Sequence, residues 1–351
     1  MRKKAMLVFW ICMFGCIFLF ANSRMAYSKD KPIELSYSSF WPVQFGMGKT
    51  ATAWAEEVEK RTNGRVKITM YHGGILTDAA NCYEGVVKGI SDIGHSVLAY
   101  SRGRFPLMEV IDLPGYSYDA VSPSRVADDL YRKFSPKELA DTHVLYIYGM
   151  LPAYITTAKR PVKTLEDLKG LKIRSAGLAT KITEALGGTP VAMPKGDQYE
   201  ALRKGMVDGA WSAPSDLMGW KAAEVAKYST VIYEVGFNTA FFVTMNLNKW
   251  NSLPPEIQKI FTEVSKEWVE YSGKAWNSLE IEGIQFGKKV GHTFIHLSPE
   301  ERTRWLKAVK HLEDDYVKAM EGKGLPGKEV LNYREQLIEK YSKMYPALKF
   351  E

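Results

Sequence analysis

The feature that most constrains the fold is an alternation of strand-like and helix-like segments that begins near residue 33. Residues 33–37 and 66–70 alternate between apolar and polar side chains, as strands do, and between them residues 47–58 carry apolar side chains at helical spacing. A helix over 78–88 and a short strand over 90–95 follow. Helices that connect successive strands are typical of a parallel sheet, so the pattern predicts an α/β architecture.

The same alternation starts again in the middle of the chain. At 351 residues the chain exceeds the size at which a single core stops growing, about 250–300 residues. Two α/β lobes are therefore expected, followed by about fifty charged, helical residues at the C-terminus. The expected strands span 145–148, 171–174, 207–211 and 240–246, and the expected helices begin at 164, 180, 198 and 253.

The N-terminus has the pattern of an export signal. Basic residues at 2–4 precede an apolar run over 5–21, and small residues around 21–28 offer cleavage sites. We expect residues 1–28 to be removed and the protein to be periplasmic. Two alternatives stay open: about 17 apolar residues is the short end of a retained membrane anchor, and Cys16 could carry a lipid.

Charge and cysteine content indicate a protein with no nucleic-acid partner and no internal disulfide. The formal charge is +7, but residues 1–28 hold four basic residues and no acid, which leaves 7 − 4 = +3 for the remainder. No basic face suited to nucleic acid stands out. After removal of the signal only Cys82 remains, so we expect no internal disulfide and a buried structural thiol at this position.

Three enzymatic motifs are incomplete or missing in this sequence. The segment 46–50 ends like a phosphate loop, but Val43 occupies the position of the first glycine. No Gly-x-Ser-x-Gly elbow occurs, and His292 and His296 lack the neighbouring glutamate of a zinc peptidase. We therefore expect no catalytic residues and no cofactor. The sequence leaves open whether a metal ion bridges the ligand.

What remains is a set of aromatic and hydrogen-bonding side chains at the expected strand ends. In open α/β sheets, ligands bind outside the carboxyl ends of the strands. Aromatic rings and short polar side chains around one cation suit a small anion with an apolar body. For each aromatic residue, ordinary core packing is the alternative. The candidate residues are Phe40, Trp41, His95, Tyr154, Arg174, Trp211, Ser212, Phe237 and Asn238.

Several spaced motifs resemble one family. The segments 168–174, 193–194 and 199–209 are similar to the central signature of TRAP-transporter solute-binding proteins of the DctP type. The segments 64–92 and 245–254 resemble earlier and later parts of the same family. The resemblance runs from about residue 33 to the C-terminus, and its ordered motifs make it specific.

The resemblance implies a two-domain α/β fold of the periplasmic-binding-protein kind, with a ligand cleft between the lobes and a long connecting helix. The N-terminal lobe is expected to comprise 30–151 plus 240–280, and the C-terminal lobe 152–239 plus 281–351. The implied function is capture of a small organic acid for a TRAP membrane permease. The alternatives are a binding protein for an ABC importer or a sensor, or an exported hydrolase or lyase on a similar scaffold.

By this resemblance, Arg174 matches the arginine that holds the ligand carboxylate in the family. A guanidinium group can pair with both oxygens of a carboxylate, which a lysine ammonium cannot do. The alternative is a structural ion pair with a nearby acid such as Asp167.

The chain also departs from the family pattern. Residues 210–214 lack the ligand-contacting asparagine of many members, so Trp211 or Ser212 would serve in its place. Tyr154 stands where sugar-acid binders have a second arginine, and Lys195 where they often have an aromatic residue. These differences predict a monocarboxylate ligand with an apolar or aromatic body.

Overall fold

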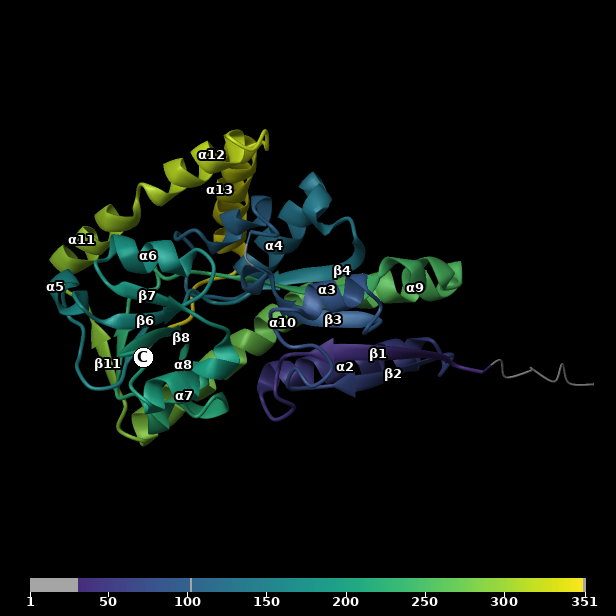
Figure 1. Ribbon diagram of the computed structural model, residues 1–351, viewed down its shortest axis with the longest axis horizontal. Helices are drawn as coiled ribbons and strands as arrows, with labels where there is room; N and C mark the ends of the chain where they lie inside the picture. The colour runs from purple at the N-terminus through teal and green to yellow at the C-terminus, as the bar shows by residue number, and fades with distance from the viewer. Residues whose placement is uncertain (1–30, 102, 350–351) are drawn as a thin grey trace, which may run out of the picture.

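The structure is a computed structural model that describes residues 31–101 and 103–349. The expected signal peptide, its cleavage site and Cys16 lie outside the described residues. Two sheets lie side by side along the long axis of the molecule, each flanked by helices (Figure 1). The expected two-lobed α/β architecture is confirmed.

The first sheet has five strands in the order β2-β1-β3-β10-β4. Strands β1, β2 and β3 run parallel, as their helical connections predict. Strand β10 runs antiparallel to both neighbours, which the strand–helix pattern did not predict. Its direction differs because it enters this sheet from the other lobe. The strands are β1 (Ile33–Ser39), β2 (Val66–Tyr71), β3 (Ile93–Val97), β4 (Thr142–Gly149) and β10 (Ala240–Asn246).

Short and long helices cover this first sheet. Helix α3 is shorter than predicted, because Asp78 accepts hydrogen bonds from the amides of Ala80 and Asn81 and forms a turn before the helix begins. Burial raises the pKa of the Cys82 thiol, which begins α3, to about 11. The elements are α2 (Gly46–Arg61), α3 (Cys82–Val87), η1 (Leu98–Tyr100), η2 (Leu107–Asp112), α4 (Val121–Phe134), η3 (Lys137–Leu139) and α9 (Leu247–Ser252).

The second sheet has six strands in the order β11-β9-β5-β8-β6-β7. Here β5 is the strand that runs antiparallel to its neighbours, β8 and β9. The strands are β5 (Tyr154–Thr157), β6 (Lys172–Ser175), β7 (Thr189–Ala192), β8 (Gly209–Ser212), β9 (Tyr228–Val231) and β11 (Thr293–His296). Between them lie α5 (Leu165–Leu168), α6 (Ala179–Ala185), η4 (Lys195–Asp197), α7 (Gln198–Arg203), α8 (Pro214–Gly219) and η5 (Ala222–Glu224).

The chain passes between the sheets through two adjacent crossing segments, 150–153 and 232–239. The amide of Ala153 donates to the carbonyl of Phe237 at 2.9 Å. A Cβ atom on Gly236 would collide with the Ala153 carbonyl oxygen, so a side chain there would push the segments apart. Because β5 and β10 each follow a crossing segment, they are the two strands that run against the rest of their sheets.

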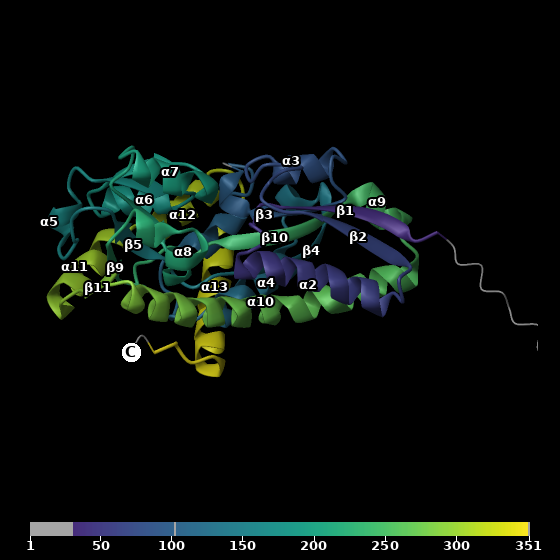
Figure 2. The same ribbon diagram turned by 90° about the horizontal axis from the view of Figure 1, so that it is seen from below.

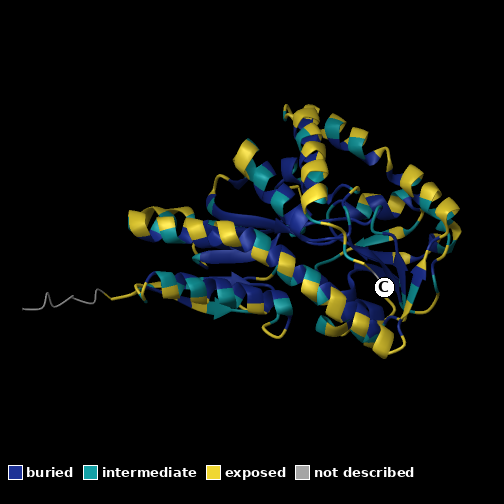
Figure 3. Cartoon of the chain, turned by 180° about the vertical axis from the view of Figure 1, so that it is seen from behind, coloured by how far each residue is buried: buried dark blue, intermediate teal, exposed yellow. Residues whose placement is uncertain are grey.

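Helix α10 (Pro255–Lys289) is the third connection between the lobes. Its 35 residues make it about 52 Å long, and it packs against α2, α4 and β4 of one lobe and α8 of the other. Figure 2 shows it running beneath both lobes, and Figure 3 shows exposed positions recurring along its outer face. Among residues 31–101 and 103–349, no helix is both long and apolar enough to cross a membrane.

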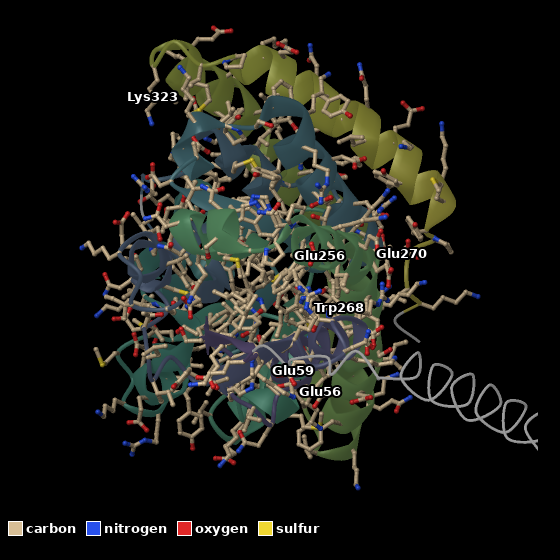
Figure 4. The ribbon with its side chains drawn as sticks, turned by 90° about the vertical axis from the view of Figure 1, so that its right-hand side faces the viewer. Glu56, Glu59, Glu256, Trp268, Glu270 and Lys323 are labelled. Atoms are coloured by element: carbon tan, nitrogen blue, oxygen red, sulfur yellow. The ribbon has the colours of Figure 1, made fainter. Side chains whose placement is uncertain are left out.

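Helix α2 is fixed against α10. The indole of Trp268 donates to the carbonyl of Thr50 at 3.0 Å. The Arg61 guanidinium pairs with both oxygens of Glu267, at 2.8 and 2.6 Å. Figure 4 looks onto this end of the molecule, where Glu59 of α2 and Trp268 of α10 are labelled. These contacts keep the first lobe on the long helix.

The C-terminal helices return the chain to the first lobe. The fully buried Arg334 of α13 donates to the carbonyls of Leu113 and Pro114, at 2.5 and 2.6 Å. This arginine holds the segment that follows η2. The last three helices are α11 (Pro299–Val309), α12 (Leu312–Glu321) and α13 (Gly327–Met344).

Candidate ligand-binding site

A small cavity of about 50 Å³ lies where the two lobes, the crossing segments and α10 meet. Both sheets contribute to its wall, so its shape depends on how the lobes are placed relative to each other. The lining residues are Trp41, Val97, Tyr100, Met150, Ala153, Arg174, Ala176, Lys195, Trp211, Ser212, Asp216, Trp220, Phe237, Thr239, Phe241 and Trp276.

Arg174 brings a cation to this cavity from β6. Its side chain is buried, and its Nε donates to the carbonyl of Met193 at 3.0 Å. Asp167, the alternative partner, instead accepts from the amides of Lys163 and Thr164 at the start of α5. No Asp or Glu of the described chain forms an ion pair with Arg174. A buried guanidinium without a counterion is costly, so the site favours an anionic ligand.

Tyr100 joins the lobes at this point. It ends η1, directly after β3 of the first lobe. Its hydroxyl oxygen accepts from Nη2 of Arg174 at 3.4 Å and from the amide of Lys195 at 3.2 Å, and both donors belong to the second lobe. A phenol that accepts two hydrogen bonds still has its own proton to donate. Because Tyr100 belongs to the first lobe, its hydrogen bond with Arg174 can form only when the two lobes lie close together.

A second cation, Lys195, is neutralised within the protein. Its Nζ donates to Asp216 at 2.5 Å, to Gln198 at 2.9 Å and to Ser212 at 3.3 Å, which uses all three of its donors. Burial lowers the pKa of Lys195, while the Asp216 carboxylate opposes that shift. The ion pair has a net charge of zero.

A further acid near the cavity is Glu280 of α10. It is fully buried and accepts from the Ser215 hydroxyl at 2.8 Å. Burial raises the pKa of Glu280 to about 8, so its carboxyl is mostly protonated at neutral pH. The charge in the cavity is then the single positive charge of Arg174. The described residues contain no group of three His, Cys, Asp or Glu side chains placed to hold a metal ion.

One wall of the cavity is aromatic. The ring of Trp41 lies 5.3 Å from that of Phe241, 5.7 Å from that of Trp276 and 6.2 Å from that of Trp220, measured between centroids. These rings come from β10, α10 and the segments after β1 and α8. A ligand whose charge faces Arg174 would place its apolar body against this wall.

The structure brings together some of the residues that the sequence singled out and not others. The residues that line the cavity are Trp41, Arg174, Trp211, Ser212 and Phe237. The residues that lie behind its wall are Phe40, His95, Tyr154 and Asn238.

Each residue behind the wall has a packing role. Phe40 packs on Trp41 with ring centroids 4.2 Å apart. Tyr154 is buried at the start of the antiparallel strand β5, opposite Ser212, rather than at a carboxyl strand end. The Asn238 amide bonds to both the amide and the carbonyl of Met150, at 3.3 and 2.7 Å, and so holds the two crossing segments together.

His95 positions Trp41 from behind. The indole N–H of Trp41 can only donate, and it lies 3.3 Å from Nε2 of His95. Nε2 is therefore the acceptor, and Nδ1 carries the proton and donates to the Tyr37 hydroxyl at 3.2 Å. Burial lowers the pKa of His95 to about 3, so the ring is neutral at physiological pH.

This neutral histidine predicts a loss of stability in mild acid. Below pH 6.5 the unfolded chain binds a proton at His95 that the folded chain binds only near pH 3. The free energy of unfolding then falls by about 1.4 kcal/mol per pH unit from this group alone. Urea unfolding at pH 7 and pH 5 should show the His95→Gln variant losing about 2 kcal/mol less than the wild type. The exposed His311, changed to Gln, is the control and should behave as wild type.

Several lining residues were not among the sequence-based candidates. Tyr100 lies only three residues beyond β3, so the rule that ligands bind at strand ends could have included it. Lys195 was noted only as a departure from the family, and the acid that pairs with it, Asp216, gave no local signal. Trp276 lies within the long helix α10. The sequence pattern of this helix predicts an apolar face but does not show that Trp276 reaches the cavity.

Most of the chain matches the model of a known protein family. The model of a family described as bacterial extracellular solute-binding protein, family 7 (DctP), matches residues 37–319. A periplasmic protein of Nostoc named for binding monocarboxylate 2-oxoacids is 30% identical over 236 residues, which cover 65% of this chain and 64% of that protein.

Solved structures are similar over nearly the whole chain. A TRAP periplasmic solute-binding protein from Desulfovibrio salexigens is 35% identical, with a TM-score of 0.78 over 91% of this chain and 99% of that one. A TRAP solute-binding protein from Rhodoferax ferrireducens, solved with copurified benzoate, is 26% identical, with a TM-score of 0.84 over 89% and 99%.

Proposed function

This chain belongs to the bacterial extracellular solute-binding proteins of family 7, the DctP family of TRAP transporters, and we propose that it captures a small organic monocarboxylate for a TRAP permease. The family consists of binding proteins, not enzymes. The observation that carries the proposal is the buried Arg174 guanidinium, which faces an interlobe cavity and pairs with no carboxylate of residues 31–101 and 103–349.

The cavity composition supports a carboxylate with one negative charge. Since the Lys195–Asp216 pair is neutral as a whole, Arg174 supplies one unit of positive charge. Its fork can pair with both oxygens of one carboxylate, and the indole rings would cover the rest of the ligand. Two relatives support this choice: the Nostoc protein is named for monocarboxylate 2-oxoacids, and the Rhodoferax protein copurified with benzoate.

Capture would work by closure of the two lobes. We propose that the bodies that move are residues 30–151 with 240–280 and residues 152–239 with 281–351, as the sequence suggests, except that α12 and α13 would stay on the first lobe, to which Tyr316 and Arg334 are hydrogen-bonded. The crossing segments would bend, and the Asn238 amide would keep them together. Tyr100 would contact Arg174 only in the closed state, so a ligand held by Arg174 would favour closure.

The setting would be the periplasm. Relatives of this chain are named as periplasmic proteins. The basic and apolar segments within residues 1–28 support a cleavable export signal. The partner would be a TRAP membrane permease, which receives the closed, loaded protein.

Two measurements test the proposal. Protein purified without denaturation and then extracted should release a small carboxylic acid, detectable by mass spectrometry in about one equivalent. Calorimetry should then show stoichiometric binding of that acid, with no product formed on long incubation. Turnover of the acid, or tight binding of neutral sugars in place of any acid, would contradict the proposal.

A further inference from the structure

Asp216 lines the cavity, and one of its oxygens accepts no hydrogen bond from the described residues. Both hydrogen bonds that its carboxylate accepts within the described chain end on Oδ2, from Nζ of Lys195 at 2.5 Å and from the amide of Ala213 at 2.8 Å. The second oxygen, Oδ1, receives none from the described residues, and Asp216 lines the cavity. The side chain is almost fully buried, at 6% exposure, so bulk water satisfies it poorly.

A carboxylate oxygen can only accept a hydrogen bond. A ligand group that lies against Oδ1 must therefore donate, as a hydroxyl or an ammonium does. A carbonyl oxygen or a second carboxylate of the ligand would place two acceptors face to face. The nearby Lys195 cannot relieve this conflict, because its three donors already serve Asp216, Gln198 and Ser212.

The net charge of the cavity with its ligand then distinguishes between the possible hydrogen-bond donors. The cavity carries the single positive charge of Arg174, since Lys195 and Asp216 cancel. A hydroxy acid with one carboxylate brings the total to zero. A zwitterionic amino acid leaves one positive charge buried, and a dicarboxylate leaves one negative charge buried, both of which are costly.

We propose that the ligand is a hydroxy monocarboxylate, whose carboxylate binds Arg174 and whose hydroxyl donates to Oδ1 of Asp216. Asp216 is thus the residue that determines specificity within the class of acids, and Lys195 fixes its orientation. The inference rests on the proposed function, which requires only that an acid binds through Arg174.

Matched ligand sets test the inference on the wild-type protein. Calorimetry would compare lactate, propanoate and pyruvate, and separately mandelate, phenylacetate and phenylglyoxylate. Within each set the apolar part of the acid is the same, and only the group on the carbon beside the carboxylate changes. In at least one set we expect the hydroxy acid to bind about 10- to 100-fold more tightly than both analogues, the range for a hydrogen bond to a charged group. Malate should bind more weakly than lactate.

The Asp216→Asn variant provides the second test. Its amide oxygen can still accept from Lys195 and Ala213, while its NH₂ group can now donate toward the cavity. The order of affinities should reverse, so that the oxo acid binds better than the hydroxy acid. Thermal unfolding would establish that the variant is folded. Glu224→Gln, a change of the same size on the surface of the same lobe, is the matched control and should keep the wild-type order.

The outcomes distinguish a failure of this inference from a failure of the proposed function on which it rests. Acids that bind the wild type with equal affinity whether or not they carry a hydroxyl would overturn the role of Asp216 but leave the proposed function standing. The same holds if the folded Asp216→Asn variant keeps the hydroxy preference. If no carboxylate in either set binds and none copurifies, both fail.

Discussion

Changing Arg174 to Met is expected to raise the dissociation constant of every acid ligand by about 100-fold or more. Two charge-assisted hydrogen bonds to a carboxylate are worth about 3–6 kcal/mol together, and the methionine side chain can form neither. Arg174→Lys should recover only part of the loss, since an ammonium cannot pair with both oxygens at once. Calorimetry with the copurified acid measures both effects.

The same change should leave the unliganded protein at least as stable as the wild type. Arg174 is a buried cation, and no carboxylate in the described part of the chain forms an ion pair with it, so its removal takes away a desolvation cost and none of the observed ion pairs. Urea unfolding without ligand is the measurement. Arg203→Met, on the surface of the same lobe, is the control for both experiments. Unchanged affinity in the Arg174→Met protein would refute the proposed site.

Changing Lys195 to Met should have the largest effect on stability. It leaves the Asp216 carboxylate buried without its ion-pair partner, and breaking a buried pair in this way costs about 3–5 kcal/mol. It also lowers the charge in the cavity from +1 to zero, so acids should bind more weakly. Urea unfolding and calorimetry measure the two losses separately.

The double change Lys195→Met with Asp216→Leu distinguishes a broken ion pair from a simple packing defect. Without either charge, the free energy of unfolding should recover most of the loss, apart from about 1 kcal/mol for the hydrogen bond that Asp216 accepts from Ala213 at the start of α8. A double variant no more stable than Lys195→Met alone would show that packing of the lysine stem, not its charge, is what matters.

Local pattern was enough to predict most elements of the fold. The strand expected at 240–246 is β10, residue for residue, because an apolar run of that length with β-branched and aromatic members fits a buried strand. The expected helix at 78–88 was too long because the Asp78 side chain binds nearby amides, a competition that periodicity does not reveal. The antiparallel direction of β5 and β10 could not be predicted from local pattern either, since it depends on where the chain enters each sheet.

By itself, the sequence determined the two α/β lobes, the family and the arginine that faces the cavity, because short-range periodicity and motif spacing carry that information. The tertiary structure alone decided what surrounds Arg174. Tyr100, Asp216 and Trp276 meet there from three distant segments, and the charge of Lys195 is neutralised by a residue 21 positions away. Charge balance and hydrogen-bond satisfaction are properties of an enclosed volume, and a linear chain has no such volume until it folds.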